Sequence, residues 1–342
     1  SSLQGPRIRV AVAGASCGWI ALHFGTRRKA LERCFIQRSG ANRPVIYELF
    51  SGVGGMRLAY QAATAAESEA CAARFRAYDI DEVCCHVYGD LYGASKVLSA
   101  RKEEPWNKME PTQDELWRCS IDKLPEAAFE GGDLWLASPP CQPFTRTGKR
   151  KDVADPRCRA LLRLIEVLPQ LKEPPKGLLL ENVVGFQSSV AHDRLRSALD
   201  DAGYDVFETL LNPIDFGFPN TRLRFYLLAK RRSLGEEPCP SGPPTVQPRP
   251  VSHFLEEVEN LQRRHALRVP AEVLQRASDE GWSLDLAVST SIATKTFTGS
   301  YGKKRYGTEG LSMAGPLLLD APVAMRRRRF TFPRPAEWKH VR

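Results

Sequence analysis

Residues 43–63, RPVIYELFSGVGGMRLAYQAA, run from a short apolar segment through three glycines into an amphipathic segment. The apolar run Val45–Phe50 predicts a buried strand, and the residues from Met56 onward predict a helix. The turn between them contains Gly52, Gly54 and Gly55. Glycine lets a backbone turn sharply and approach a ligand, so this order is typical of nucleotide-binding folds. The spacing is not GxGxxG, so a nucleoside-containing ligand and a purely structural turn both fit it.

The alternation of strand and helix continues along the chain. Residues 73–90 predict a strand that ends at Asp79 and then a helix, and residues 129–141 predict a strand that runs into a turn. PKGLLLENVVGF, 175–186, is a continuous apolar run of the kind buried in parallel sheets, and RLRFYLLAKR, 222–231, predicts a later strand. One predicted helix has an apolar stripe of Leu161, Leu162, Ile165, Leu168 and Leu171. Together these elements predict an α/β fold, an open sheet with helices on both faces.

The composition describes a globular chain with two basic ends. Of its 342 residues, 42% are hydrophobic and 26% are charged, which is enough for a sizeable core. No apolar run approaches the ~20 residues that a membrane helix needs, so no membrane partner is expected. The net charge of +9 is uneven, because residues 1–43 carry +7 and residues 325–342 carry +6. Basic ends suit a polyanionic partner, although solvated tails would have the same composition.

One of the nine cysteines, Cys141, lies where chemistry is expected. An odd number of cysteines without a CxxC pair indicates neither a disulfide framework nor a zinc site, so we expect free thiols, a reducing compartment and no metal. In SPPCQPF, Cys141 follows a strand end, which is where open α/β sheets bind ligands. Pro139 and Pro140 stiffen the approach to it. Cys141 is a nucleophile if positive charge stabilises its thiolate; the alternative is a small buried apolar side chain.

Other polar residues lie near predicted strand ends. Asp79 comes 24 residues after the last turn glycine, about where a carboxylate meets ribose hydroxyls, and Ile80 beside it could pack on an adenine. Glu181 ends an apolar strand, where a partly apolar pocket favours an acid or hydrogen-bond donor; the alternative is a surface turn. Arg222 and Arg224 alternate on a predicted strand and so point to one face. They suit phosphate or an anionic intermediate, or else a solvated strand edge.

Taken in order, these motifs are more specific than any one of them. The chain runs from FSGVGG through the acid-ended strand to PPCQ, ENV and NTRLR. This order resembles the cytosine-C5 methyltransferase superfamily over residues 44–230 and, more weakly, over residues 231–330. SPPCQPFTR is similar to the branch, historically named as DNA methyltransferase homologues, that methylates cytosine 38 of aspartate tRNA. Its other markers here are Asp152, Asp155, Arg157 and the stretch TFTGSYGKKRYGTEG at 296–310.

The resemblance implies S-adenosylmethionine as the cofactor, bound on a Rossmann-like sheet. The residues implied to line its methionine end are Phe50, Ser51, Val53, Gly54 and Gly55. Those implied around the adenosine are Asp79 on the ribose and Ile80 on the adenine, with Ser120, Ile121 and Ser138 nearby. The implied catalytic residues are Cys141, Glu181, Arg222 and Arg224. Asn220 stands where the family's QxRxR element has Gln.

These roles imply methyl transfer to C5 of a cytosine in tRNA. Cys141 would attack C6, so that C5 gains enamine character and accepts the methyl group, while Glu181 engages N3 and N4. The base must leave its stack, which costs less in an anticodon loop than in a duplex. The main interpretation is a monomeric enzyme of the cytoplasm or nucleus that acts on tRNA-Asp. The alternatives are a DNA cytosine-C5 methyltransferase and a catalytically impaired RNA-binding remnant.

The same resemblance predicts how the chain is organised. Residues 44–230 form the expected catalytic domain, and residues 231–324 form a small target-recognition lobe that opens with a Pro- and Gly-rich linker. Residues 1–43 are expected to be a disordered basic extension, with organelle targeting as a secondary interpretation, and residues 325–342 a basic tail. The family's last helix and Gly-Asn-Ser segment have no counterpart here, which predicts a truncated sequence or an impaired protein. Thr296 replaces the branch's Cys in Cys-Phe-Thr, with a modest expected effect on RNA contacts or packing.

Overall fold

The computed structural model describes most residues between 43 and 234 and short segments after them. The described residues are 43–64, 73–93, 97–99, 114–145, 151–234, 246–254, 275, 279, 286–295 and 317–318. The predicted extension before residue 43, the stretch 296–310 and the basic tail lie outside them. The chain forms two compact units, of which the larger contains the main sheet. The smaller unit contains Asn212–Arg222 and the described residues from 246 onward.

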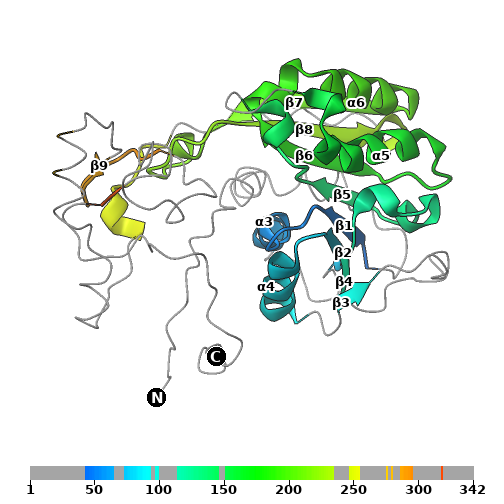
Figure 1. The fold of residues 1–342 in the computed structure, drawn as a ribbon, viewed down its shortest axis with the longest axis horizontal. Helices are drawn as coiled ribbons and strands as arrows, with labels where there is room; N and C mark the ends of the chain where they lie inside the picture. Colours follow the sequence, from blue (N-terminus) through cyan, green and yellow to red (C-terminus); the bar gives the residue numbers. More distant parts are fainter. Residues whose placement is uncertain are drawn as a thin grey trace. The chain divides into compact units, whose positions relative to one another are not determined.

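The larger unit is built on an eight-stranded sheet in the order β3-β4-β2-β1-β5-β6-β8-β7 (Figure 1). Its strands are β1 Val45–Leu49, β2 Arg74–Asp79, β3 Val97–Ser99, β4 Glu115–Arg118, β5 Leu134–Ala137, β6 Gly177–Val183, β7 Tyr204–Leu211 and β8 Arg224–Arg231. Neighbours from β3 to β6 run parallel, whereas β8 runs antiparallel to β6 and to β7. The predicted open α/β sheet is confirmed. Strands β3, β4 and β7 were not predicted, because VLS and ELWR are short and YDVFETLL has a mixed pattern.

Helices cover both faces of this sheet, as predicted. The main helices are α3 Gly55–Thr64, α4 Glu82–Tyr92, α5 Arg159–Val167 and α6 Val190–Asp201. On one face, α3 packs Met56 and Tyr60 against Ile46 and Phe75, which lie on β1 and β2. On the other face, α5 and α6 pack together over β5, β6 and β8 in the largest apolar cluster. Helices α3 and α4 accordingly lie beside the β1–β4 part of the sheet, and α5 and α6 beside its other end (Figure 1).

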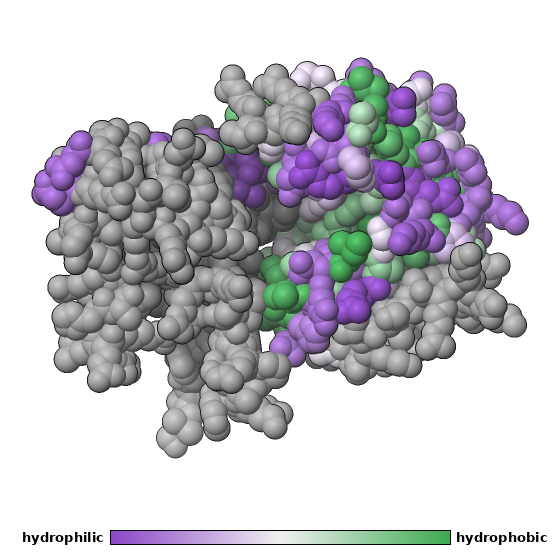
Figure 2. All heavy atoms as spheres, viewed as in Figure 1, coloured by the Kyte–Doolittle hydropathy of each residue, from purple (hydrophilic) through white to green (hydrophobic). Residues whose placement is uncertain are grey.

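One residue of the apolar stripe that was predicted for the α5 region is not fully buried. The predicted members that are buried are Leu161, Ile165, Leu168 and Leu171. Leu164 completes the buried side, while Leu162 is only half-buried. The outward faces of the described helices in the larger unit are mostly polar, with small apolar patches (Figure 2). Among the described residues, no helix is both long enough and apolar enough to cross a membrane.

A buried polar network ties the end of β1 to the start of α3. The carboxylate of Glu48, 1% exposed, accepts hydrogen bonds from the Arg57 backbone N–H at 3.0 Å and from Tyr88 Oη at 2.9 Å. The Arg57 guanidinium pairs with Asp114 and lies over the rings of Phe75, Tyr88 and Tyr92. Burial raises the pKa of Glu48 to about 7. Because Glu48 and Arg57 flank the glycine turn, the network holds both of its ends.

Replacing Glu48 by Gln should flatten the pH dependence of folding stability. The pKa of Glu48 is about 7 in the folded chain and 4.5 ordinarily, so the folded chain binds this proton more tightly than the unfolded chain. The stability from this group is therefore fully present below about pH 4.5 and is lost as the pH rises through about 7, by at most about 3 kcal/mol. Urea unfolding near pH 5 and near pH 8 measures the loss. Equal losses for wild type and Glu48→Gln would contradict the prediction.

Candidate active site

Cys141 lies at the carboxyl edge of the sheet on a tightly held turn. Its segment leaves β5, and the Ser138 N–H still donates to the Leu49 carbonyl oxygen at 3.2 Å, one residue beyond the strand. Cys141 is the N-cap of a short 3₁₀ helix, η5 Gln142–Phe144, and its thiol is free and half-buried. Cys158, which is 1% exposed, is by contrast a small buried apolar side chain, which was the alternative considered for Cys141. The position of Cys141 is that expected of a nucleophile, and its catalytic role stays a prediction.

The segment after β6 braces this turn from one side. The Asn182 side-chain amide donates to the Pro139 carbonyl oxygen at 3.4 Å. In the short helix η9, Val184–Ser188, the Phe186 ring packs edge-on against Phe144 with centroids 5.0 Å apart. Gly185 passes so close that a Cβ atom there would lie 2.3 Å from the Phe144 carbonyl oxygen. The backbone contact at Gly185 therefore sets how near η9 comes to the thiol-bearing turn.

Glu181 and Arg224 form a partly buried ion pair at the same edge. Glu181 Oε1 lies 3.3 Å from Arg224 Nε, and the two side chains are only 13% and 16% exposed. They meet because β6 and β8 are antiparallel, which brings the start of β8 beside the end of β6. Ala137 pairs with Leu180 across β5 and β6, so Ser138 and Glu181 leave neighbouring strands side by side. The predicted Cys141 turn and the predicted acid are thus brought to one edge.

The prediction that Arg222 and Arg224 share a strand is wrong. Strand β8 begins at Arg224, and Arg222 belongs to the smaller unit. There the Arg222 N–H donates to Asn212 Oδ1 at 2.8 Å, and the Thr221 N–H donates to the Thr294 carbonyl oxygen at 2.8 Å. These bonds occupy the backbone N–H groups of Thr221 and Arg222. These two residues therefore do not continue the hydrogen-bond pairing of β8. Alternation along a strand therefore says nothing about the face on which Arg222 lies.

The glycine turn is held by the acid at the end of β2. Asp79 Oδ2 accepts from the Gly52 N–H at 2.7 Å, and Asp79 Oδ1 accepts from the Asp81 N–H at 2.8 Å. Burial raises the pKa of Asp79. The Ile80 N–H also bonds this carboxylate, so about one of its roughly four lone-pair sites remains for a ligand. Phe50, at the other end of the turn, adopts a left-handed φ of 59°, the kind of backbone strain that clusters at functional sites.

Several residues of this region suit a nucleoside-containing ligand. Ser51 is 6% exposed, and its hydroxyl has no hydrogen-bond partner among the described residues. A buried hydroxyl without a partner is costly unless a ligand bonds to it. A Cβ atom at Gly52 would meet nothing within 4 Å, and Ile80 is 69% exposed beside Asp79. Together, the Ser51 hydroxyl, the open backbone at Gly52 and the apolar Ile80 side chain fit a ribose and a base.

Other predicted cofactor residues have structural partners. Gly54 makes room for Tyr92 of α4, since a Cβ atom there would lie 2.3 Å from the ring, and Tyr92 Oη donates to the Gly54 carbonyl oxygen at 2.7 Å. Val53 and Gly55 are half-buried. The Ser120 hydroxyl bonds to Asp122, and the Ile121 side chain, 2% exposed, packs in the core. Ser138 is half-buried between β5 and the Cys141 turn.

A residue absent from the predicted catalytic set lies close to Cys141. Arg157, on the 3₁₀ helix η7 Pro156–Cys158, is held by two parallel bonds to Asp155, Nε–Oδ1 at 2.9 Å and Nη2–Oδ2 at 2.7 Å. The hydrogen bond to Asp155 raises the pKa of Arg157, and η7 packs against η5, whose N-cap is Cys141. Asp155 is 6% exposed while the Arg157 side chain is 53% exposed, so a buried carboxylate fixes an accessible cation. In the sequence, the Asp-x-Arg spacing of these two residues was the signal that could have identified Arg157.

Comparison with known proteins agrees with this geometry. The family described as "C-5 cytosine-specific DNA methylase" matches residues 45–306. A Homo sapiens protein named "tRNA (cytosine(38)-C(5))-methyltransferase" is 37% identical over 247 residues, which is 72% of this chain and 55% of that protein. A Spodoptera frugiperda protein of the same name is 31% identical over 281 residues, 81% of this chain and 74% of that protein. The chain spans about half the length of the first relatives that it matches.

Solved structures show the same fold. The Schizosaccharomyces pombe Dnmt2 methyltransferase superposes with a TM-score of 0.59 at 25% identity, covering 87% of this chain and 81% of that one. The Entamoeba histolytica methyltransferase EhMeth superposes with a TM-score of 0.63 at 23% identity, over 87% and 81% of the two chains. The order of strands, the cysteine turn and the match over residues 45–306 agree. The chain belongs to the C-5 cytosine-specific DNA methylase family.

Proposed function

We propose that the protein containing this chain transfers a methyl group from S-adenosylmethionine to C5 of a cytosine in tRNA. The observation that carries the proposal is the half-buried Cys141 thiol at the carboxyl edge of the sheet, next to the strand that bears Glu181. The relatives' shared name supports tRNA as the substrate and cytosine 38, in the anticodon loop, as the target. Aspartate tRNA is the specific substrate that the motif resemblance favours.

The chain's own residues would activate the base. The Cys141 thiolate adds to C6 of cytosine, which removes the aromaticity of the ring and makes C5 nucleophilic. As negative charge develops at N3, Glu181 in its acid form donates its proton to N3 and its second oxygen accepts from the exocyclic amine. Arg224, whose Nε lies 3.3 Å from Glu181 Oε1, pairs with the carboxylate that results. When bound, the cofactor supplies the electrophilic methyl group. Loss of the C5 proton then expels Cys141 and leaves 5-methylcytosine.

The cofactor would lie over the glycine turn. Asp79 and Ser51 are the groups proposed for its polar atoms, because Asp79 keeps a free lone pair and the Ser51 hydroxyl has no partner among the described residues. Ile80 would carry the adenine on an exposed apolar side chain. Gly52 lets the ligand approach the backbone closely. Phe50, Val53, Gly55, Ser120, Ile121 and Ser138 stay predictions from the motif resemblance.

A single-stranded loop is the more favourable target on physical grounds. The base must be unstacked to reach Cys141, and an anticodon loop has already lost much of the pairing that a duplex would have to break. A tRNA substrate is consistent with a place in the cytoplasm or nucleus, which we propose for the protein as a monomer. Duplex DNA is the competing substrate, and the following experiment separates the two.

Cys141→Ala should abolish methyl transfer while leaving the fold intact. We expect wild type to incorporate tritiated methyl groups into a tRNA-Asp transcript but not into one with uridine at position 38. Loss of the nucleophile should lower the rate by about a thousandfold or more. Cys84→Ala is the matched control, because Cys84 is a half-buried thiol whose pKa burial raises to about 12.

Three outcomes would contradict this proposal. Transfer that survives Cys141→Ala would overturn the covalent mechanism. Incorporation into duplex DNA but not into tRNA would overturn the substrate. Transfer to neither, with the relatives active under the same conditions, would overturn the activity itself.

Gly185→Ala should both slow methyl transfer and destabilise the chain. The added Cβ would lie 2.3 Å from the Phe144 carbonyl oxygen, so the turn that carries Cys141 has to shift. Crowding of this kind costs about 1–3 kcal/mol of stability. We expect the rate at saturating substrate to fall at least about tenfold, because a displaced nucleophile loses its alignment. Gln187→Ala, an exposed position on the same short helix, should change neither the rate nor the urea midpoint.

A further inference from the structure

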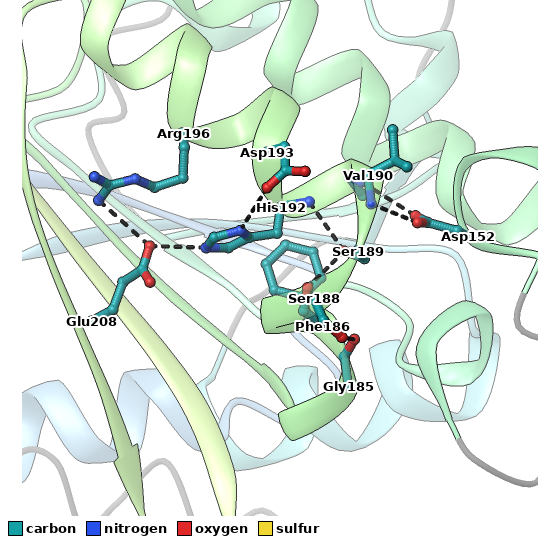
Figure 3. A network of polar contacts seen from close by, with 11 residues as sticks. Asp152, Gly185, Phe186, Ser188, Ser189, Val190, His192, Asp193, Arg196 and Glu208 are labelled. Atoms are coloured by element: carbon teal, nitrogen blue, oxygen red, sulfur yellow. Dashed lines mark hydrogen bonds and ion pairs between the residues drawn. The ribbon is translucent and has the colours of Figure 1, made fainter.

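Asp152 caps a helix that begins 38 residues later in the chain. Its carboxylate accepts from the Val190 N–H at 2.6 Å and from the Ala191 N–H at 3.2 Å (Figure 3). Val190 and Ala191 are the first two residues of α6, so these are N–H groups that the helix itself leaves without partners. The negative charge also suits the positive end of the helix dipole. A long-range contact of this kind ties two distant segments together.

The backbone of Asp152 is strained where it makes this contact. Its φ is 49°, in the left-handed region that residues other than glycine rarely adopt. Such a conformation persists only where the surrounding bonds hold it, and strained residues cluster at functional sites. The two bonds to α6 are what hold it.

Helix α6 already has its own local cap. Ser189, its N-cap residue, accepts from the His192 N–H at 3.1 Å and donates to the Phe186 carbonyl oxygen at 2.6 Å (Figure 3). His192 Nε2 lies 2.9 Å from Glu208 Oε1 on β7, so the first turn of α6 is also fixed to the sheet. The start of α6 is thus a rigid support. Asp152 fastens another part of the chain to it.

That other part is the chain that supports Cys141. Asp152 opens the 3₁₀ helix η6 Asp152–Ala154, and both η6 and η7 pack against η5, whose N-cap is Cys141. Asp155 in this segment holds the Arg157 guanidinium near the thiol. Phe186, just before α6, holds the turn from its other side through Phe144. The beginning of α6 therefore supports the nucleophile's turn on two sides.

We propose that Asp152 is a positioning residue that anchors the segment after Cys141 to the start of α6, and so places the thiol and Arg157 for attack on the base. This role rests on the proposed function. A residue that only stabilised α6 would act on the helix and leave the thiol unchanged. The two roles differ in what happens when each of the two caps of α6 is removed.

Removing the two caps separately tests the anchor. Asp152→Gly removes the carboxylate and relieves the backbone strain, whereas Asp152→Asn keeps an acceptor in a residue that tolerates the left-handed region. Ser189→Ala is the matched control, because it removes the local cap of the same helix and leaves the anchor in place. We expect Asp152→Gly and Ser189→Ala each to lower the melting temperature by a few degrees.

Only loss of the anchor should change the reactivity of the Cys141 thiol. In single-turnover transfer to tRNA at saturating cofactor, Asp152→Gly should be slower by about tenfold or more with unchanged tRNA affinity, while Ser189→Ala stays within about twofold of wild type. Asp152→Asn should restore most of the rate. The alkylation rate of Cys141 by iodoacetamide, read by peptide mass spectrometry, should change in Asp152→Gly and not in Ser189→Ala.

Two outcomes would overturn the role of Asp152. An equal loss of transfer rate in Ser189→Ala and Asp152→Gly would show that Asp152 acts only as a helix cap. Unchanged alkylation of Cys141 in Asp152→Gly would show that the anchor does not place the thiol. Alkylation needs neither tRNA nor cofactor, so a failure of the proposed methyl transfer would not be mistaken for a failure of the anchor.

Discussion

Parallel pairing of β5 with β1 on one side and β6 on the other is the constraint on which the candidate site depends. Leu49, Ala137 and Leu180 are register partners across these three strands. Strands β1 and β5 therefore end together at the carboxyl edge of the sheet, one leading to the glycine turn and the other to Cys141. Strand β6 continues past the same level and carries Glu181 beside them. A slip of one residue would move every side chain of the slipped strand to the opposite face.

Buried charge maintains that edge at some cost in stability. Glu48 and Arg57 lie on either side of the glycine turn, and Arg76 pairs with Glu115 at 2.6 Å across β2 and β4 while only 1% exposed. Desolvation of such groups often offsets their attraction, so these networks are better understood as fixing geometry than as adding stability. The glycine turn that Glu48 and Arg57 flank is the part of the fold that the proposed cofactor would touch.

Short 3₁₀ segments, more than the long elements, do the fine positioning. The turn at Cys141 lies between η9, which touches it through Phe186 and Gly185, and the η6–η7 segment that carries Arg157. Each of these segments is three to five residues long and has few bonds of its own. Their order comes from contacts with one another and with the start of α6. Substitutions at the contact residues of these short segments should therefore disturb the site even where they leave the hydrophobic core intact.

The sequence by itself determined the local features: the strand and turn before α3, the acid that ends β2, the turn at Cys141 and the apolar strand with Glu181. Each depends on residues that are neighbours in the chain, so periodicity, glycine and proline reveal it. Only the tertiary structure decided that β8 is antiparallel, that Arg222 lies outside it and that Gly54 makes room for Tyr92. The same holds for the contact of Asp152 with the start of α6. These depend on contacts between residues tens of positions apart, which no local pattern records.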